Sequence, residues 1–171
     1  YAMRLAGFGF RAPKNPLLGY DVAGRVEAVG ANAGAFQPGD EVFGTCRGSF
    51  AEFAVARADQ LASKPGNVSF EEAAAVPTSG YTALQAVREH GGVRAGRRVL
   101  IIGAGGGVGT FAVQIAKADG AVVTGVSSTA KTELVRSLGA DHVIDYTREE
   151  LADARTRYDV ILDIAGNRPL S

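Results

Sequence analysis

Apolar residues in the second half of the chain come in short runs rich in Val and Ile, a pattern typical of strands buried in a parallel sheet. These runs occupy residues 99–102, 122–126, 143–144 and 160–164. The stretches between them predict helices at 108–117, at 130–138 and, more briefly, after Thr147. Strands separated by helices indicate right-handed βαβ units, and hence a doubly wound parallel sheet of the α/β class. Because a complete sheet of that kind has about six strands in the order 3-2-1-4-5-6, four strands predict an incomplete one.

Local signals mark the ends of these helices. Gly120 and Gly139 stand where a residue of left-handed conformation commonly terminates a helix. Thr147 and Glu150 have the spacing of a capping box, which predicts that Thr147 begins the short third helix.

The first half of the chain has a different pattern. Runs of β-forming residues, separated by turns that contain Gly and Pro, fall at 22–29, 41–45, 50–56 and 60–63. They predict part of a small antiparallel barrel or sandwich, with too few strands to close it. Residues 70–75 then predict a short helix stopped by Pro77, and residues 79–90 predict a second helix ended by two glycines. We therefore divide the chain into two domains, 1–75 and 76–171.

The balance of charges argues against a polyanionic partner. The chain has 171 residues with 18 Lys plus Arg and 18 Asp plus Glu, so no net charge attracts nucleic acid or an anionic membrane. Apolar residues make up 46%, and no apolar run approaches the roughly 20 residues needed to span a bilayer. The single cysteine, Cys46, excludes an internal disulfide and a cysteine-based zinc site, and it fits a reducing, cytoplasmic setting.

Both ends of the sequence look cut. The first residue is Tyr1 rather than Met, no leader-like stretch follows it, and residues 167–171 resemble the beginning of a helix that does not continue. We therefore expect the chain to be a fragment of a longer protein.

A glycine-rich turn at 103–109 joins the first predicted strand of the sheet to its helix. Ala104, Gly106 and Gly109 have the spacing of the dinucleotide-binding fingerprint, with Ala in the first glycine place. The fingerprint allows a sharp turn and a close approach to the pyrophosphate, which then faces the positive end of the helix. Ala104 keeps a small side chain but gives up free access to positive φ. The alternative is a structural turn without a ligand, which the flanking strand and helix make less favoured.

The residues after the second predicted strand favour NADP(H) over NAD(H). An NAD-specific domain commonly places Asp or Glu roughly 20 residues beyond the fingerprint, where the carboxylate binds the ribose hydroxyls. Here that region holds Ser127, Ser128, Thr129 and Lys131. A 2′-phosphate would therefore meet donors instead of a repelling carboxylate. Alternatively, Ser128 or Thr129 caps the next helix and Lys131 is a solvated residue of its first turn.

The sequence assigns no catalytic residue. His90 and His142 are expected to be exposed or to cap elements. The arginine next to Cys46 could lower the pKa of the thiol, but no His or acid partner is evident and a loop thiol is the favoured interpretation. Tyr20 and Asp21 could act as acid or base, or could simply lead into a strand. No cluster of His, Cys or Glu has metal-ligand spacing, so no metal ligand is predicted.

Six landmarks, in the right order along nearly the whole chain, resemble the medium-chain dehydrogenase/reductase superfamily. The resemblance is to its zinc-free quinone oxidoreductase branch, which includes ζ-crystallin-like proteins. The landmarks are 18–24 (LGYDVAG), 38–44 (PGDEVFG), 48–53 (GSFAEF), 75–83 (AVPTSGYTA), the turn at 104–109, and 138–141 (LGAD) followed by 145–146 (DY).

The resemblance implies an N-terminally truncated GroES-like β-barrel domain (1–75) followed by a C-terminally truncated Rossmann domain (76–171), with the active site in the cleft between them. It also implies hydride transfer from NADPH to a quinone, an enone or a related conjugated carbonyl, and a homodimer in the complete protein. Family positions around the 2′-phosphate match Ser127, Lys131 and Tyr146. The expected cofactor-binding residues are Thr78 near the nicotinamide, Ala104, Gly106, Gly107, Val108, Gly109, Ser127, Ser128, Lys131, Tyr146 and, in the loop after the fourth strand, Gly166.

Departures from the zinc-dependent relatives imply a metal-free protein. Residues 19–21 are Gly-Tyr-Asp where zinc-dependent alcohol dehydrogenases carry Gly-His-Glu, and Ala75 falls near their cysteine ligand. The substrate carbonyl would then be polarised by hydrogen-bond donors, partly from a region before Tyr1, so this chain could be inactive by itself. Two other functions stay open: a metal-free alcohol or aldehyde oxidoreductase, and a non-catalytic NADP(H)-binding structural or sensing protein.

Overall fold

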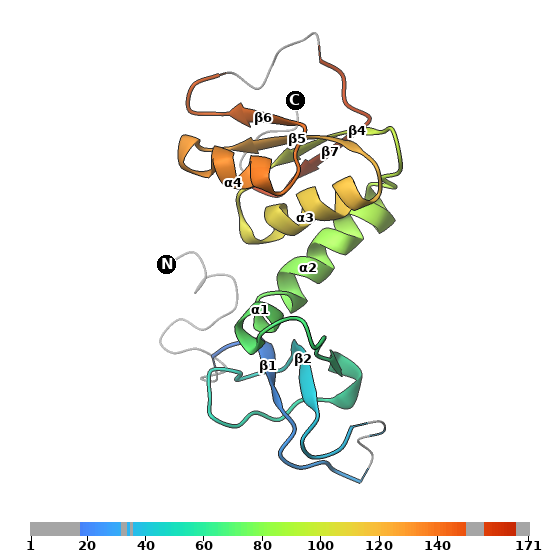
Figure 1. The fold of residues 1–171 in the computed structure, drawn as a ribbon, viewed down its shortest axis with the longest axis vertical. Coiled ribbons are helices and arrows are strands. Elements are labelled where there is room, and N and C mark those ends of the chain that lie inside the picture. Colours follow the sequence, from blue (N-terminus) through green and yellow to red (C-terminus); the bar gives the residue numbers. More distant parts are fainter. Residues whose placement is uncertain (1–17, 32–33, 35, 150–155, 167–171) are drawn as a thin grey trace, which may run out of the picture. The chain divides into compact units, whose positions relative to one another are not determined.

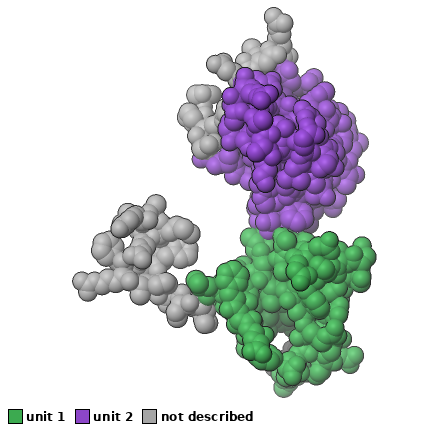
Figure 2. Space-filling model, turned by 60° about the vertical axis from the view of Figure 1, so that its left-hand side comes forward, with its two compact units in different colours: residues 1–78 green, residues 79–171 purple. Residues whose placement is uncertain are grey.

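The chain divides into two compact units, which we describe separately (Figure 2). The computed structural model describes residues 18–31, 34, 36–149 and 156–166. The division by contacts falls between Thr78 and Ser79, whereas the sequence pattern places the boundary at 75/76. Among the described residues, no helix combines the length and apolarity that crossing a bilayer requires.

The first unit contains a three-stranded antiparallel sheet of order β1-β2-β3. Its elements are β1 (Asp21–Arg25), β2 (Glu41–Thr45), the 3-10 turn η2 (Ala58–Gln60), β3 (Leu61–Ser63) and the short helix α1 (Phe70–Ala74). Helix α1 begins at a capping box, in which the Glu72 N–H donates to Ser69 Oγ (3.1 Å) and the Ser69 N–H donates to Glu72 Oε2 (2.8 Å).

The predicted strand at 50–56 is wrong. Residues 50–53 form a bend, in which the N–H of Ala51 donates to the carbonyl of Ser49 (2.9 Å), and residues 54–57 have no regular structure. Phe50, Phe53 and Val55 are 81%, 69% and 93% exposed. A β-forming sequence becomes a strand only when a neighbouring strand pairs with it, and no strand of the described part of the chain pairs with this segment.

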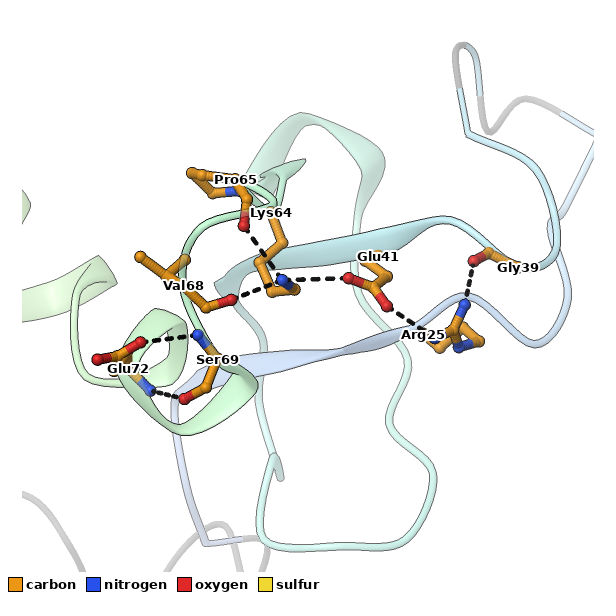
Figure 3. A network of polar contacts seen from close by, with 8 residues as sticks. All are labelled: Arg25, Gly39, Glu41, Lys64, Pro65, Val68, Ser69 and Glu72. Atoms are coloured by element: carbon orange, nitrogen blue, oxygen red, sulfur yellow. Dashed lines mark hydrogen bonds and ion pairs between the residues drawn. The ribbon is translucent and has the colours of Figure 1, made fainter.

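Lys64 connects the sheet of the first unit to α1 (Figure 3). Its side chain is 5% exposed, and its Nζ donates to the carbonyls of Pro65 (3.1 Å) and Val68 (2.7 Å) and lies 3.1 Å from Glu41 Oε2. The ammonium group also lies 5.2 Å from the centre of the Phe70 ring. The hydrogen bond from Lys64 lowers the pKa of Glu41. A buried cation with several acceptors therefore fixes the end of β3 against β2.

The second unit confirms the α/β class and the doubly wound arrangement. Its parallel sheet has the order β6-β5-β4-β7, which is 3-2-1-4 in chain order, so the fourth strand lies beside the first as expected. The strands are β4 (Arg98–Ile102), β5 (Val122–Ser127), β6 (His142–Asp145) and β7 (Val160–Asp163), and each lies where the apolar runs predict it.

The helices agree with the sequence in place but differ in detail. They are α2 (Pro77–Leu84), the π-helical segment η3 (Gln85–His90), α3 (Gly107–Ala118), the 3-10 turn η4 (Thr129–Lys131) and α4 (Thr132–Ser137). Pro77 opens α2 as well as ending the preceding helix, because proline suits the first turn. The wider η3 segment is not signalled in the sequence. Gly120 (φ +79°) and Gly139 (φ +98°) follow α3 and α4 in left-handed conformation, as predicted.

The helix predicted to begin at Thr147 is not seen in residues 146–149, which form turns, and Glu150 lies outside the described residues. The predicted capping box therefore stays a prediction; in the described residues, the Thr147 hydroxyl donates to Asp145 Oδ1 (2.7 Å).

The core of the second unit lies between α3 and one face of the sheet. Residues 109, 112, 113 and 116 of α3 are buried, and this i, i+3, i+4, i+7 spacing presents one apolar stripe to the strands. Opposite this stripe, Val99, Ile101 and Val123 are completely buried. In Figure 1, α3 and α4 both run along this face of the sheet. The packing fixes the start of α3 beside the carboxyl end of β4.

Candidate dinucleotide-binding site

A pocket of about 330 Å³ opens at the carboxyl ends of the strands in the second unit. It lies where the chain order reverses, with β5 on one side of β4 and β7 on the other, which is the usual ligand position in doubly wound sheets. The pocket is lined by Gly103, Gly105, Gly106, Val126, Ser127, Ser128, Lys131, Tyr146, Ile164 and Ala165.

Gly103 is the residue that turns the backbone at the end of β4. It has φ +86°, and its N–H and that of Ala104 both donate to the carbonyl of Val126 (3.2 and 3.0 Å). Ala104 is completely buried and does not have positive φ. Ala104 therefore does not need the positive φ that alanine adopts poorly, because the left-handed conformation belongs to Gly103 before it.

The glycines of the turn have different neighbours. A methyl group on Gly109 would lie 2.1 Å from the carbonyl oxygen of Gly103, so this position lets α3 pack directly against the turn. A methyl group on Gly106 would meet only that same oxygen, at 3.3 Å, and Gly106 lines the pocket. Gly107 faces Ser79, whose hydroxyl oxygen would lie 3.2 Å from a methyl group there.

Gly106 is also the N-cap of α3, and its conformation is extended (φ −90°, ψ 173°). The first N–H groups of a helix have no partner within the helix, and they carry its positive dipole end. Because Gly105 and Gly106 line the pocket, an anion held there would face that end. Val108 and Gly109, which were predicted to bind the cofactor, pack toward the core and support the turn without lining the pocket.

The same pocket carries the polar residues expected for a 2′-phosphate. Ser127, which is 4% exposed, Ser128 and Tyr146 line it, and Lys131 is the one charged residue of the lining. No carboxylate belongs to this lining in the described part of the chain. A phosphate beside these residues would therefore meet a cation and three hydroxyl groups.

The side chains of Ser128 and Thr129 do not cap a helix. Ser128 is the N-cap residue of η4 but makes no capping hydrogen bond with its side chain. The hydroxyl of Thr129 donates to Asp145 Oδ2 (2.5 Å) instead of to a helix N-terminus. The capping interpretation is therefore not supported for Ser128 and Thr129, whereas Lys131 is exposed, as a solvated residue would be.

Gly105 makes room for Lys131, a role that the sequence did not reveal. A methyl group on Gly105 would lie 2.8 Å from Lys131 Cβ and 3.1 Å from its Cγ, so the lysine stem crosses the bare backbone of the turn. The sequence also missed Val126, Ile164 and Ala165. Val126 lies near the carboxyl end of β5, Ile164 and Ala165 follow β7, and only the folded sheet brings them to one pocket.

Gly166 and Thr78 also lie outside the pocket lining, as do the expected site residues Ala104, Gly107, Val108 and Gly109. Gly166 has φ +63°, and its N–H donates to Asp163 Oδ1 (3.0 Å), next to the pocket residue Ala165. Thr78 belongs to the first unit, where both its N–H (3.1 Å) and its hydroxyl donate to Asp21 Oδ1. A carboxylate thus stabilises the first turn of α2.

The remaining candidates show no catalytic arrangement. His90 and His142 are exposed. Cys46 is buried, and its burial raises the pKa of the thiol, so the suggestion that the adjacent arginine lowers it is wrong. Among the described residues, no group of three His, Cys, Asp or Glu side chains could hold a metal ion.

Comparison with known families matches both halves of the chain. Residues 2–66 match the alcohol dehydrogenase GroES-like domain, and residues 107–171 match the zinc-binding dehydrogenase family. Among curated proteins, the chain is 44% identical over 160 residues to the mitochondrial NAD(P)H oxidoreductase RTN4IP1 of Mus musculus, covering 87% of this chain and 40% of the relative. It is 40% identical over 172 residues to 2-methylene-furan-3-one reductase of Solanum lycopersicum, covering 92% and 44%. The chain thus spans less than half the length of these two relatives.

Solved structures support the same assignment. The quinone oxidoreductase of Coxiella burnetii superposes with a TM-score of 0.83 at 34% identity, covering 96% of this chain and 52% of that one. The Escherichia coli quinone oxidoreductase complexed with NADPH gives a TM-score of 0.74 at 33% identity, covering 80% and 43%. These matches confirm the fold class, a GroES-like part followed by a Rossmann sheet.

Proposed function

We propose that this chain, which belongs to the medium-chain dehydrogenase/reductase superfamily as a protein of the quinone oxidoreductase type, forms the cofactor-binding part of an NADPH-dependent oxidoreductase. The complete protein would transfer hydride to a quinone or an α,β-unsaturated carbonyl, as the names of several relatives describe for those proteins. The observation that carries the proposal is the pocket at the switch point, where Lys131 is the one charged lining residue.

The residues of this pocket fit a dinucleotide. The start of α3 offers N–H groups to a pyrophosphate, and Gly106 leaves the space that a side chain would fill. Gly103 and Gly109 keep the turn close to the helix, so that its geometry exists before the ligand binds. When bound, the nicotinamide ring supplies the hydride, and the protein supplies binding and orientation.

The polar residues of the lining fit the 2′-phosphate that distinguishes NADPH from NADH. Lys131 provides the positive charge, and Ser127 and Ser128 provide hydroxyl donors. No lining carboxylate in the described part of the chain opposes the phosphate. In the first unit, Asp21 fixes the N–H and the hydroxyl of Thr78, the residue that we expect near the nicotinamide.

We further propose that the protein works without zinc. Tyr20 stands where zinc-dependent relatives carry a histidine ligand, and the position of their cysteine ligand falls near Ala75. Hydrogen-bond donors would then polarise the substrate carbonyl. A metal-free alcohol or aldehyde oxidoreductase is less favoured, because alkoxide stabilisation would need another Lewis acid or donor. Cytoplasmic location and a homodimer of the complete protein are proposals that rest on the single cysteine and on the family resemblance.

Assaying the complete protein for NADPH oxidation with a quinone, an enone and an aldehyde tests the proposal. Turnover with the quinone or the enone, unchanged by a chelator, is the expected result. Turnover with the aldehyde alone would support the alcohol or aldehyde oxidoreductase. NADPH binding without turnover of any of the three would support the non-catalytic alternative.

A further inference from the structure

Asp145, the last residue of β6, holds a buried carboxylate just outside the pocket. The residue is 7% exposed and does not line the pocket. Its Oδ2 accepts a hydrogen bond from the hydroxyl of Thr129 (2.5 Å), while its Oδ1 accepts from the N–H (3.0 Å) and the hydroxyl (2.7 Å) of Thr147. The two threonine hydroxyls also lie 2.8 Å apart, and Arg148 Nε lies 3.7 Å from Oδ2.

These bonds join the two segments that carry the polar end of the pocket. Thr129 begins η4, the single turn that ends at Lys131, and its carbonyl accepts the hydroxyl of Thr132 (3.0 Å). On the other side, Asp145 pairs with Ser127 in the sheet, and the N–H of Tyr146 donates to the carbonyl of Ser127 (3.2 Å). The Asp145 carboxylate therefore lies between the Lys131 turn and the Tyr146 loop, and it bonds to both.

We propose that Asp145 is a positioning residue for recognition of the 2′-phosphate, holding the Thr129–Lys131 turn and the Tyr146 loop in the geometry that the phosphate requires. This inference rests on the proposed NADP(H) function. Asp145 acts through hydrogen bonds rather than through its charge, since a carboxylate near a phosphate is repulsive. Preorganised donors bind an anion more tightly because fewer side chains have to be ordered upon binding.

The state of the carboxyl group fits this role. The hydrogen bond from Thr129 lowers the pKa of Asp145, and the bonds from Thr147 and the charge of Arg148 act in the same direction. Asp145 is therefore an acceptor at neutral pH, as the two hydroxyls that donate to it require.

Positioning and charge make opposite predictions for two substitutions. Asp145→Asn removes the charge, but its amide oxygen can accept from Thr147 and its NH₂ group can donate to the Thr129 oxygen. Asp145→Ala removes the charge and the link together. If Asp145 acted by charge alone, both variants would bind NADPH more tightly. If it positions the turn, the alanine variant binds NADPH more weakly and the asparagine variant retains most of the affinity.

The chain offers a matched control in Asp141, just before the amino end of the same strand. Its carboxylate accepts from Lys117 Nζ (2.8 Å) and from the N–H of Val123 (2.7 Å). Asp141 precedes β6, whereas the pocket residue Tyr146 follows the other end of that strand. Asp141→Ala therefore removes a comparable set of structural hydrogen bonds without touching either segment of the pocket.

The test compares dissociation constants for NADPH and NADH by cofactor fluorescence, with folding checked by circular dichroism. We expect Asp145→Ala to lower the preference for NADPH over NADH by about tenfold or more. A change of this size corresponds to the loss of one or two hydrogen bonds that order the site. Asp145→Asn should largely restore that preference, and Asp141→Ala should leave it unchanged.

An unchanged preference in folded Asp145→Ala, or an equal loss in Asp141→Ala, would overturn the positioning role. If Asp145→Ala does not fold, Thr129→Val removes the same link from its other end, and an unchanged preference there overturns the inference equally. A wild-type chain without preference for NADPH would instead overturn the proposed function, so the two failures are distinguishable.

Discussion

Gly106→Val separates cofactor binding from folding at the glycine-rich turn. The Gly106 backbone is extended, which a β-branched residue adopts readily, and a Cβ there would meet only the Gly103 oxygen, at 3.3 Å. We therefore expect the free energy of unfolding to fall by no more than about 1 kcal/mol, the scale of a changed N-cap. The valine side chain would project into the pocket, in the space that the pyrophosphate needs.

The expected loss of affinity follows from the hydrogen bonds that are blocked. A bond from a backbone N–H to a charged group contributes about 1.5–3 kcal/mol, so each lost bond weakens binding by roughly 10- to 100-fold. NADPH and NADH should be affected equally, because both contain the pyrophosphate. Fluorescence titration of each cofactor, together with urea denaturation, measures both effects.

Gly109→Ala is the matched comparison three residues along the same turn. Its Cβ would lie 2.1 Å from the Gly103 oxygen and 2.8 Å from Ala104 Cα, so the backbone must shift. Overpacking of this kind costs typically about 1–3 kcal/mol or more, and it should appear as lost stability. A folded Gly106→Val variant that binds both cofactors as the wild type does would refute the placement of the pyrophosphate.

Three further predictions concern single side chains. Lys131→Glu should shift preference from NADPH toward NADH, and an unchanged affinity ratio would mean that Lys131 is only a surface residue. Lys64→Met should lower the stability of the first unit by about 2–3 kcal/mol, because the nearly buried ammonium pairs with Glu41 and donates to two carbonyls. Thermal unfolding measures this loss, and NADPH binding at the second unit should not change. Burial opposes ionisation of Asp141, but the hydrogen bonds from Lys117 and from a backbone N–H lower its pKa. The contribution of Asp141 to stability is therefore complete above the unfolded pKa of about 4 and is lost as the pH falls through the lower folded pKa. Asp141→Asn should reduce the acid-dependent loss of stability in denaturation curves between about pH 5 and 2. An unaltered pH profile would contradict this assignment.

The Rossmann half could be predicted closely because its signals are local. Buried parallel strands have continuous apolar runs, and Gly120 and Gly139 mark the ends of helices by a conformation that glycine adopts without strain. Whether residues 50–56 form a strand could not be predicted from such local signals. Their sequence has strand propensity, but whether it pairs depends on other segments of the chain.

The candidate site likewise contains residues that the sequence signals and residues that only the folded structure reveals. Gly106, Ser127, Ser128, Lys131 and Tyr146 were predicted and line the pocket, because motif spacing and the missing acid are visible in the sequence. The separate roles of the other glycines in the turn depend on distances between atoms of different elements, and the link from Asp145 to Thr129 joins residues 16 apart in the chain. Such contacts follow only from the register of β5 with β6.

The most direct test of the central claim is titration of this chain with NADPH and NADH, followed by cofactor fluorescence, in a sample shown to be folded. The account predicts tight binding of NADPH and distinctly weaker binding of NADH, with the difference lost in Lys131→Glu. Equal binding of the two cofactors, tighter binding of NADH, or binding of neither would contradict the claim that the pocket between the glycine turn and Lys131 is an NADP(H) site.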